Sequence, residues 1–298
     1  MIHTQFMYGV GLEGLAAAKI LRKPLVGTNH TALGEFLRFG PIQKEWFKKS
    51  ILRYQAWYYN FCSLVTSPSD IAFKEMLENG FDRPHRTLSN PIDPVFKPAS
   101  VERKKELKKK FGLSELAVCC VGRLGPEKNV DVVIRAMAIV KEKIPSVNLA
   151  IAGHGSEFER LKKLTVELGI EKNVKFLGTL PKSGVAEVYG ACETFAIAST
   201  SETQSMTLTQ SLSCGLPAVG VRALALPEFI NEWNGFIVEP GDYRALAEKL
   251  KIILTDDILR KKLGAGGKES VGKFRVENIA KEWENIYVKA IKNHEKSK

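Results

Sequence analysis

A carboxylate and a carboxamide, Glu202 and Gln210, are separated by seven residues in a stretch rich in hydroxyl side chains. The residues before them, 193–198, are mostly apolar and predict a strand. Residues 205–214 predict a short helix, because Gly215 after them is a common helix stop. A strand therefore leads into a loop that carries the Glu202 carboxylate, and the loop leads into a helix.

The start of this predicted helix is a candidate site for an anion. The first N–H groups of a helix lack partners within the helix, and the helix dipole favours negative charge there. Ser205, Met206 and Thr207 occupy this position, and Gln210 lies roughly 5.4 Å, or one turn, further along. The arrangement suits a ligand that combines a hydroxyl-rich part, a phosphate part and a ribose.

A second candidate region follows the apolar run 116–124. A continuous apolar run of this kind predicts a strand buried on both faces, as in a parallel sheet. Gly122 permits close approach of the backbone, and Arg123 and Lys128 lie on the next loop, where open α/β sheets bind ligands. Taken alone, these two cations are equally typical of a solvated surface loop.

In both regions the sequence resembles the retaining glycosyltransferases of family 4, which have the GT-B fold. That family carries Glu-x7-Glu at the first region and Gly-Arg-Leu-x-x-Glu-Lys-Asn at the second. The resemblance implies that Glu202 contacts the donor sugar and that residue 210 binds the ribose. It also implies that Gly122, Arg123 and Lys128 bind the donor diphosphate together with residues 205–207.

Gln210 departs from the family pattern, which has Glu at this position. A carboxylate accepts hydrogen bonds from both ribose hydroxyls, whereas an amide offers one acceptor oxygen and an NH₂ donor. The loss of charge assistance is worth about 1–2 kcal/mol. Donor binding is therefore expected to be weaker, or to be tuned to another nucleotide.

Alternating strand and helix patterns predict an α/β protein with parallel sheets. The resemblance implies a GT-B-like chain of two doubly wound, Rossmann-type domains that face each other across a cleft. We expect residues 1–98 to form a partial acceptor-side domain, residues 99–272 the donor-binding domain, and residues 273–298 a helix that packs back on the first domain. The first domain is predicted to be incomplete, because it offers four strands where about six are usual. Either the natural product begins upstream of Met1, or the protein is a degenerate relative.

His30 follows a short predicted strand in the first domain. The family often has Thr-x-His at this place, which implies that His30 is catalytic together with Glu202, through hydrogen bonding and polarisation of the substrates. A capped or core histidine is the other interpretation. The resemblance further implies that the acceptor attacks the face from which the nucleotide leaves, and that the departing phosphate oxygen takes its proton.

The segment from His30 to Phe39 resembles family members that glycosylate lipids, and the predicted helix after Pro41 mixes aromatic and basic residues. This mixture is typical of an interfacial membrane helix, and equally of a core helix with a solvated basic side. Residues 102–110 add six basic residues against two acidic ones, and the formal net charge is +11. The charge suits an anionic membrane surface. Nucleic acid is not expected as a partner, because no nucleic-acid-binding motif is present.

The composition favours an enzyme of a reducing compartment. The five cysteines show no metal-like spacing, and most of them lie in apolar runs, so we expect free thiols. No signal peptide or membrane span is recognisable. We expect a cytoplasmic location, with a peripheral position at the inner face of the membrane left open. No cofactor and no metal are expected.

These features predict a retaining hexosyltransferase that uses a nucleotide-diphospho sugar, with UDP-glucose and GDP-mannose as the leading donor types. The expected acceptor is a lipid, a lipid-linked sugar or another glycan. The alternative is a non-catalytic subunit that binds nucleotide sugars or partner proteins, which Gln210 and the short first domain suggest.

Overall fold

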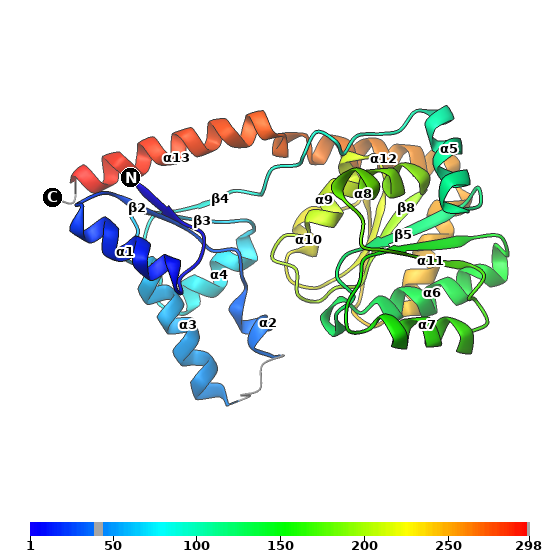
Figure 1. Ribbon diagram of the computed structural model, residues 1–298, viewed down its shortest axis with the longest axis horizontal. Coiled ribbons are helices and arrows are strands. Elements are labelled where there is room, and N and C mark those ends of the chain that lie inside the picture. Colours follow the sequence, from blue (N-terminus) through cyan, green and yellow to red (C-terminus); the bar gives the residue numbers. More distant parts are fainter. Residues whose placement is uncertain (39–43, 297–298) are drawn as a thin grey trace. The chain divides into compact units, whose positions relative to one another are not determined.

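A computed structural model describes residues 1–38 and 44–296 (Figure 1). Phe39 and Pro41, which belong to the proposed lipid-related segment, lie outside the described residues. The chain forms two compact units. One unit comprises Met1–Pro91 together with Val276–Lys298, and the other comprises Ile92–Arg275.

The first unit contains a parallel sheet in the order β1-β2-β3-β4. Its strands are β1 (Ile2–Thr4), β2 (Leu25–Thr28), β3 (Leu64–Ser67) and β4 (His85–Thr87). Its helices are α1 (Val10–Ile20), α2 (Leu33–Arg38), α3 (Glu45–Tyr59), α4 (Asp70–Glu78) and α13 (Val276–Lys296).

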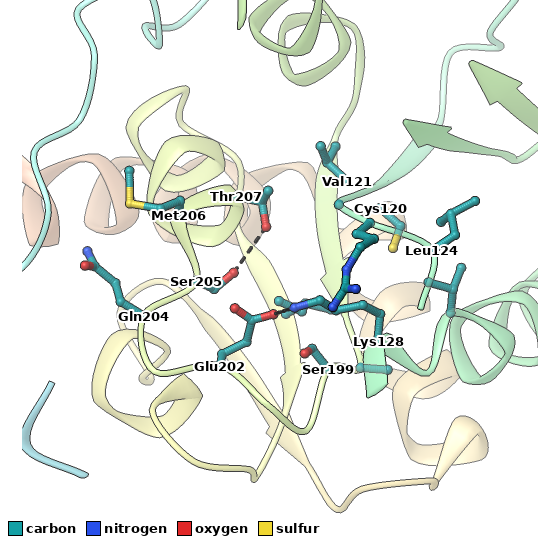
Figure 2. A pocket seen from close by; sticks show the side chains of 15 residues that line it. Cys120, Val121, Leu124, Lys128, Ser199, Glu202, Gln204, Ser205, Met206 and Thr207 are labelled. Atoms are coloured by element: carbon teal, nitrogen blue, oxygen red, sulfur yellow. Dashed lines mark hydrogen bonds and ion pairs between the residues drawn. The ribbon is translucent and has the colours of Figure 1, made fainter. Parts of the chain in front are cut away.

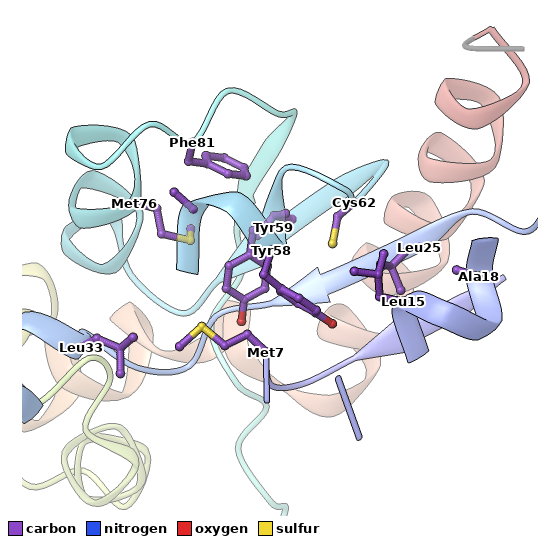
Figure 3. Packing of buried hydrophobic residues seen from close by; sticks show 12 residues of the cluster. Met7, Leu15, Ala18, Leu25, Leu33, Tyr58, Tyr59, Cys62, Met76 and Phe81 are labelled. Atoms are coloured by element: carbon purple, nitrogen blue, oxygen red, sulfur yellow. The ribbon is translucent and has the colours of Figure 1, made fainter. Parts of the chain in front are cut away.

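Alternation of side chains along β2 and β3 builds two hydrophobic layers in this unit. Successive residues of a strand point to opposite faces of the sheet. Leu25 and Val65 join one buried cluster, to which α1, α3 and α4 also contribute (Figure 3). Their neighbours Val26 and Leu64 pack on the other face, against Ile286 and other buried residues of α13. The C-terminal helix therefore completes the core of the first unit.

The second unit contains a six-stranded parallel sheet in the order β10-β9-β8-β5-β6-β7. Its strands are β5 (Ala117–Val121), β6 (Asn148–Ala152), β7 (Val174–Gly178), β8 (Thr194–Ile197), β9 (Ala218–Val221) and β10 (Gly235–Val238). Its helices are α5 (Val101–Phe111), α6 (Val130–Lys143), α7 (Phe158–Glu167), α8 (Lys182–Ala191), α9 (Met206–Ser213), α10 (Leu226–Phe229), α11 (Tyr243–Thr255) and α12 (Asp257–Ser270), with short 3₁₀ helices at Pro126–Lys128 and Gly272–Phe274.

The order of strands reverses between β5 and β8. From β5 the chain proceeds outward through β6 and β7, and it then returns to place β8, β9 and β10 on the other side. Helices α6, α7 and α11 cover one face of the sheet, and α8 and α9 lie on the other (Figure 1). In open α/β sheets, ligands bind at the carboxyl ends of the strands that flank such a reversal.

The basic run 102–110 lies on α5, where much of its charge is paired. Lys104 and Lys108 place their ammonium groups 3.0 and 2.9 Å from a carboxylate oxygen of Glu193. Arg103 and Lys110 both pair with Glu187. The interpretation of this run as surface charge is wrong for Lys108, which is buried with Glu193. Four of the six cations thus hold α5 on its own unit.

Among the residues that the structure describes, no helix is both long enough and apolar enough to cross a membrane.

Candidate functional site

A cavity of about 330 Å³ lies at the carboxyl ends of β5 and β8, beside the first turn of α9 (Figure 2). Its walls come from the loop after β5 and the loop after β8, both within the second unit. Seven of the residues singled out in the sequence line it: Gly122, Arg123, Lys128, Glu202, Ser205, Met206 and Thr207. The structure therefore gathers most of the predicted site residues around one hollow.

Gly122 allows the chain to turn sharply from β5 into the loop that carries the cations. Its φ of 150° lies in a region that side-chain-bearing residues rarely adopt. Gly153, after β6, packs so closely that a Cβ there would meet the carbonyl oxygen of Gly122 at 1.8 Å. Beyond the turn, Arg123 has a side chain that is 71% exposed and pairs with Glu127 at 2.5 Å. The guanidinium is thus on the solvent side, where it can reach a ligand.

Lys128 and Glu202 form an ion pair within the cavity. The Lys128 Nζ atom lies 2.6 Å from Glu202 Oε1, and both side chains are largely shielded from solvent (Figure 2). The two residues come from different loops, 74 positions apart in the chain. A cation and a carboxylate therefore meet at the point where the two loops converge.

The first turn of α9 presents polar groups to the cavity. Ser205 caps the helix, because its hydroxyl accepts a hydrogen bond of 3.3 Å from the Leu208 amide. The same hydroxyl lies 3.1 Å from the hydroxyl of Thr207. The amides at the start of a helix have no acceptor within the helix. Those of Met206 and Thr207 lie beside the cavity, and their role as an anion site stays a prediction.

Asn129 is a structural residue of the site that sequence reasoning missed. Its amide donates to Ala198 O at 3.2 Å and to Thr200 Oγ1 at 3.3 Å, which ties the two cavity loops together. In return, the Thr200 amide donates to Glu127 O at 3.1 Å. The asparagine itself was the signal in the sequence, because asparagine adopts the left-handed conformation more readily than most residues, and Asn129 has a φ of 47°.

The loop that carries Glu202 has a further support that the sequence did not reveal. The Glu202 carbonyl accepts a hydrogen bond of 3.1 Å from the amide of Ala225, just before α10. Gln204, which is buried, also lines the cavity. The hydrogen bond from Ala225 thus anchors the backbone of the loop at Glu202.

Two predicted site residues lie elsewhere. Gln210 sits half-exposed in the second turn of α9 and is not among the described residues that line the cavity. His30 belongs to the first unit, just beyond the carboxyl end of β2. Its Nε2 atom lies 2.6 Å from Gln5 Oε1, and burial lowers the pKa of its imidazole.

Within residues 1–38 and 44–296, no group of three or more His, Cys, Asp or Glu side chains is placed to hold a metal ion. That the reaction needs no metal stays a prediction.

Comparison with known families places this cavity in context. The family model "Glycosyl transferases group 1" matches residues 102–270, which contain every residue of the cavity, and the model "Glycosyltransferase Family 4" matches residues 1–96. The chain belongs to the group 1 glycosyl transferases. The resemblance to family 4 inferred from Glu202, Arg123 and Lys128 is thereby confirmed.

Individual relatives are longer than this glycosyl transferase chain. Alpha-monoglucosyldiacylglycerol synthase of Streptococcus pneumoniae is 27% identical over 98% of this chain and 66% of its own length. A GDP-mannose-dependent phosphatidylinositol monomannoside mannosyltransferase of Corynebacterium glutamicum is 30% identical over 59% of this chain and 48% of its own length. The chain thus spans about half to two thirds of the length of these relatives.

The fold agrees with that of solved structures. HepE of Anabaena, in complex with UDP and glucose, superposes with a TM-score of 0.81 at 24% identity, over 93% of this chain and 74% of HepE. This likeness confirms the GT-B fold, with two Rossmann-type domains.

Proposed function

We propose that the chain transfers a hexose from a nucleotide-diphospho sugar to a lipid or lipid-linked acceptor, with retention of configuration. The observation that carries the proposal is the convergence of Arg123, Lys128 and the first turn of α9 on the cavity that also holds Glu202. Fixed cations and helix amides around one hollow suit a diphosphate, and a carboxylate beside them suits sugar hydroxyls.

The chemical demand on this site comes from the leaving group. When the bond between sugar and phosphate breaks, negative charge grows on the nucleotide diphosphate, and preorganised donors stabilise it. Arg123, Lys128 and the amides of Met206 and Thr207 would supply those donors. Lys128 would exchange part of its contact with Glu202 for the diphosphate, which frees the carboxylate to accept from a sugar hydroxyl.

We assign the remaining roles on the same basis. Gln210 would bind the ribose diol with one hydroxyl accepting and the other donating. His30, whose pKa is lowered by burial, would hydrogen-bond to the transferred sugar or to the acceptor. The acceptor hydroxyl would attack the face that the nucleotide leaves, and the departing phosphate oxygen would take its proton. The donor base stays open between UDP and GDP, since the names of the relatives include both.

For the acceptor we propose a lipid at an anionic membrane face, which the exposed side of α3 would approach. Two tyrosines of this helix, Tyr58 and Tyr59, are buried in the core, whereas Trp46 and Trp57 are 65% and 49% exposed. Trp57 belongs to a row of aromatic rings in contact. The centroid of its ring lies 5.0 Å from the centroid of Phe61 and 5.5 Å from the centroid of Tyr54. The Tyr54 ring also stacks on Tyr8, with centroids 5.3 Å apart. We call this row, with Trp46, the aromatic face.

Cations accompany the aromatic face. Lys44, Lys49 and Arg53 of the same segment are exposed, and Lys19 Nζ lies 4.1 Å from the centroid of the Phe61 ring. Aromatic side chains at the level of the headgroups together with surface cations favour anionic bilayers. The name of the Streptococcus pneumoniae relative, a glucosyldiacylglycerol synthase, supports a lipid acceptor.

Sedimentation with lipid vesicles tests the membrane part. The chain should sediment with phosphatidylglycerol vesicles and stay in solution with phosphatidylcholine vesicles. Replacing both Trp46 and Trp57 by Ala should abolish binding, and replacing Trp233, an exposed tryptophan of the second unit that is 61% accessible, should not. Equal binding of all three proteins would contradict the assignment of the aromatic face.

A transfer assay tests the enzymatic part. The chain is incubated with UDP-glucose or GDP-mannose and diacylglycerol or a monoglycosylated lipid, and the product is identified by mass and by the NMR coupling of its anomeric proton. An α-linked product is expected from these α-linked donors. Glu202→Gln should retain nucleotide binding and lose turnover by about 10–100-fold. A β-linked product would overturn retention.

The second candidate, a non-catalytic subunit that binds nucleotide sugars or partner proteins, is favoured by the absence of a carboxylate at Gln210. It predicts nucleotide binding without any transferred sugar, under conditions in which donor and vesicles are saturating. Detection of a glycosylated product that disappears in Glu202→Gln would exclude it.

A further inference from the structure

Two histidines of the first unit are linked by one amide side chain. Gln5 follows β1 and lies between His3, in the middle of that strand, and His30, beyond the end of β2. Its Nε2 atom lies 3.2 Å from His3 Nε2, and its Oε1 atom lies 2.6 Å from His30 Nε2. The sequence motifs discussed above did not draw attention to either Gln5 or His3.

The chemistry of the amide decides which ring nitrogens carry protons. An amide nitrogen only donates and an amide oxygen only accepts. The Gln5 NH₂ group therefore donates to an unprotonated Nε2 of His3, and the Gln5 oxygen accepts from a protonated Nε2 of His30. Since a neutral imidazole carries one ring proton, the acceptor nitrogen of His30 is Nδ1.

His3 has partners on two other elements, β2 and α13, that are compatible with this tautomer. Its Nδ1 lies 3.0 Å from the hydroxyl of Tyr287, on α13. Its Nε2 lies 2.8 Å from the Thr28 hydroxyl, which continues to Thr66 at 2.7 Å. The Trp283 ring also packs on the imidazole, with centroids 4.7 Å apart. A hydroxyl can donate or accept, so these contacts orient the His3 ring beside Gln5, and the Gln5 amide sets the direction of the hydrogen bond to His30.

We propose that Gln5 is a positioning residue that holds His30 as the Nε2–H tautomer and so presents Nδ1 as its hydrogen-bond acceptor for a substrate hydroxyl. The ligand class is a sugar or acceptor hydroxyl, which donates to an imidazole nitrogen. This role for the substrate rests on the proposed function of His30, whereas the tautomer itself does not. Burial lowers the pKa of His3 to about 4 and that of His30 below its usual range, which keeps both rings neutral near pH 7.

Nitrogen-15 NMR of the imidazole rings tests the tautomer without any assay of activity. The full chain has five histidines, and the signals of His30 are assigned by their disappearance in His30→Gln. In the wild-type protein at pH 7.5, Nε2 of His30 should show the shift of a protonated ring nitrogen and Nδ1 that of an unprotonated one. The reverse pattern would overturn the proposal.

Two substitutions of Gln5 separate its hydrogen bond from its bulk. Gln5→Met has a similar length but accepts no strong hydrogen bond, and it should make the two ring nitrogens of His30 shift toward averaged values. Gln5→Glu keeps an acceptor for Nε2–H and should restore the wild-type tautomer. An unchanged His30 pattern in Gln5→Met would show that Gln5 does not position the ring.

Turnover provides the link to the proposed function. Gln5→Met should lower kcat about tenfold and leave KM for the donor within about twofold, with Gln5→Glu recovering part of the loss. If the wild-type chain transfers no sugar, the proposed function fails while the NMR result still decides the role of Gln5. If transfer occurs and Gln5→Met changes the tautomer but not kcat, the role in presenting His30 to substrate is overturned.

Discussion

Lys128 Nζ lies 2.6 Å from Glu202 Oε1, so the cation and the carboxylate of the cavity neutralise each other. Their loops are tied by Asn129, whose amide donates to Ala198 O and Thr200 Oγ1. A ligand that carries both a diphosphate and a sugar can satisfy both partners at once. A ligand with only one of these parts must compete with the ion pair. If the cavity holds the donor as proposed, the pair favours complete donors over fragments.

Lys128→Met is expected to weaken binding of UDP or GDP by about 10–100-fold, because a charge-assisted hydrogen bond to phosphate is worth about 1.5–3 kcal/mol. Uridine or guanosine, which lack phosphates, should lose little. Isothermal titration calorimetry measures both. Lys172→Met, which removes an exposed lysine before β7, is the matched control and should bind as the wild type does. An equal loss for nucleosides and nucleotides would argue against a phosphate contact.

Gln210→Glu tests whether the chain is tuned to its carboxamide. In an enzyme adapted to Gln210, whose amide is proposed to donate to one ribose hydroxyl and accept from the other, the introduced carboxylate has no donor and should reduce turnover several-fold. In a degenerate relative, the same change should strengthen donor binding by restoring the family residue. Parallel measurement of kcat and of the donor Kd distinguishes the two. Unchanged values of both would remove Gln210 from the ribose contact.

Glu193→Gln should strongly destabilise the second unit. Glu193 is 5% exposed, accepts from the Ala117 amide at 2.7 Å, and is the partner of the buried Lys108. Removal of one member of a buried pair leaves an uncompensated charge and costs about 3–5 kcal/mol. The urea midpoint of unfolding, followed by circular dichroism, reports the change. Glu187→Gln, which removes the more exposed partner of Arg103 and Lys110, should cost at most about 1 kcal/mol.

Stability should fall as the pH is lowered from about 6.5 to 4. Burial lowers the pKa of His3 and of His85 to about 4, from 6.5 in the unfolded chain. Between these values the unfolded state binds more protons, so the free energy of unfolding decreases as the pH falls. Urea titrations at several pH values measure the slope. His85→Gln should flatten it relative to the wild type, and identical slopes would contradict a lowered pKa for His85.

Local patterns predicted the elements of the fold well. Residues 193–198 were expected as a strand and contain β8 (Thr194–Ile197), and Ser205 and Cys214 flank α9 as its caps. Such predictions succeed because alternation, apolar runs and helix stops act between near neighbours. The loops that carry Arg123, Lys128 and Glu202 were located for the same reason, since each follows a recognisable buried strand.

The contacts that the sequence did not reveal are distant in the chain. Lys108 appeared to belong to a solvated basic run, and its partner Glu193 lies 85 residues away. Tyr287 meets His3 across 284 residues. Both contacts depend on how helices pack on the sheets, and no local spacing encodes that. Gln210 differs from these two cases. Its place in the sequence motif was clear, but its side chain is not among the described residues that line the cavity.

The most direct test of the central claim is a thermal-shift titration of the chain with UDP, GDP, UDP-glucose and GDP-mannose, beside the double variant Arg123→Met/Lys128→Met. A ligand at 100 times its dissociation constant stabilises the folded state by about 2.7 kcal/mol. One nucleotide series should raise the melting temperature of the wild-type chain, with the sugar-bearing form raising it most, and the double variant should not respond. No shift with any of the four ligands at millimolar concentration, or an equal shift in the double variant, would contradict a donor site in this cavity.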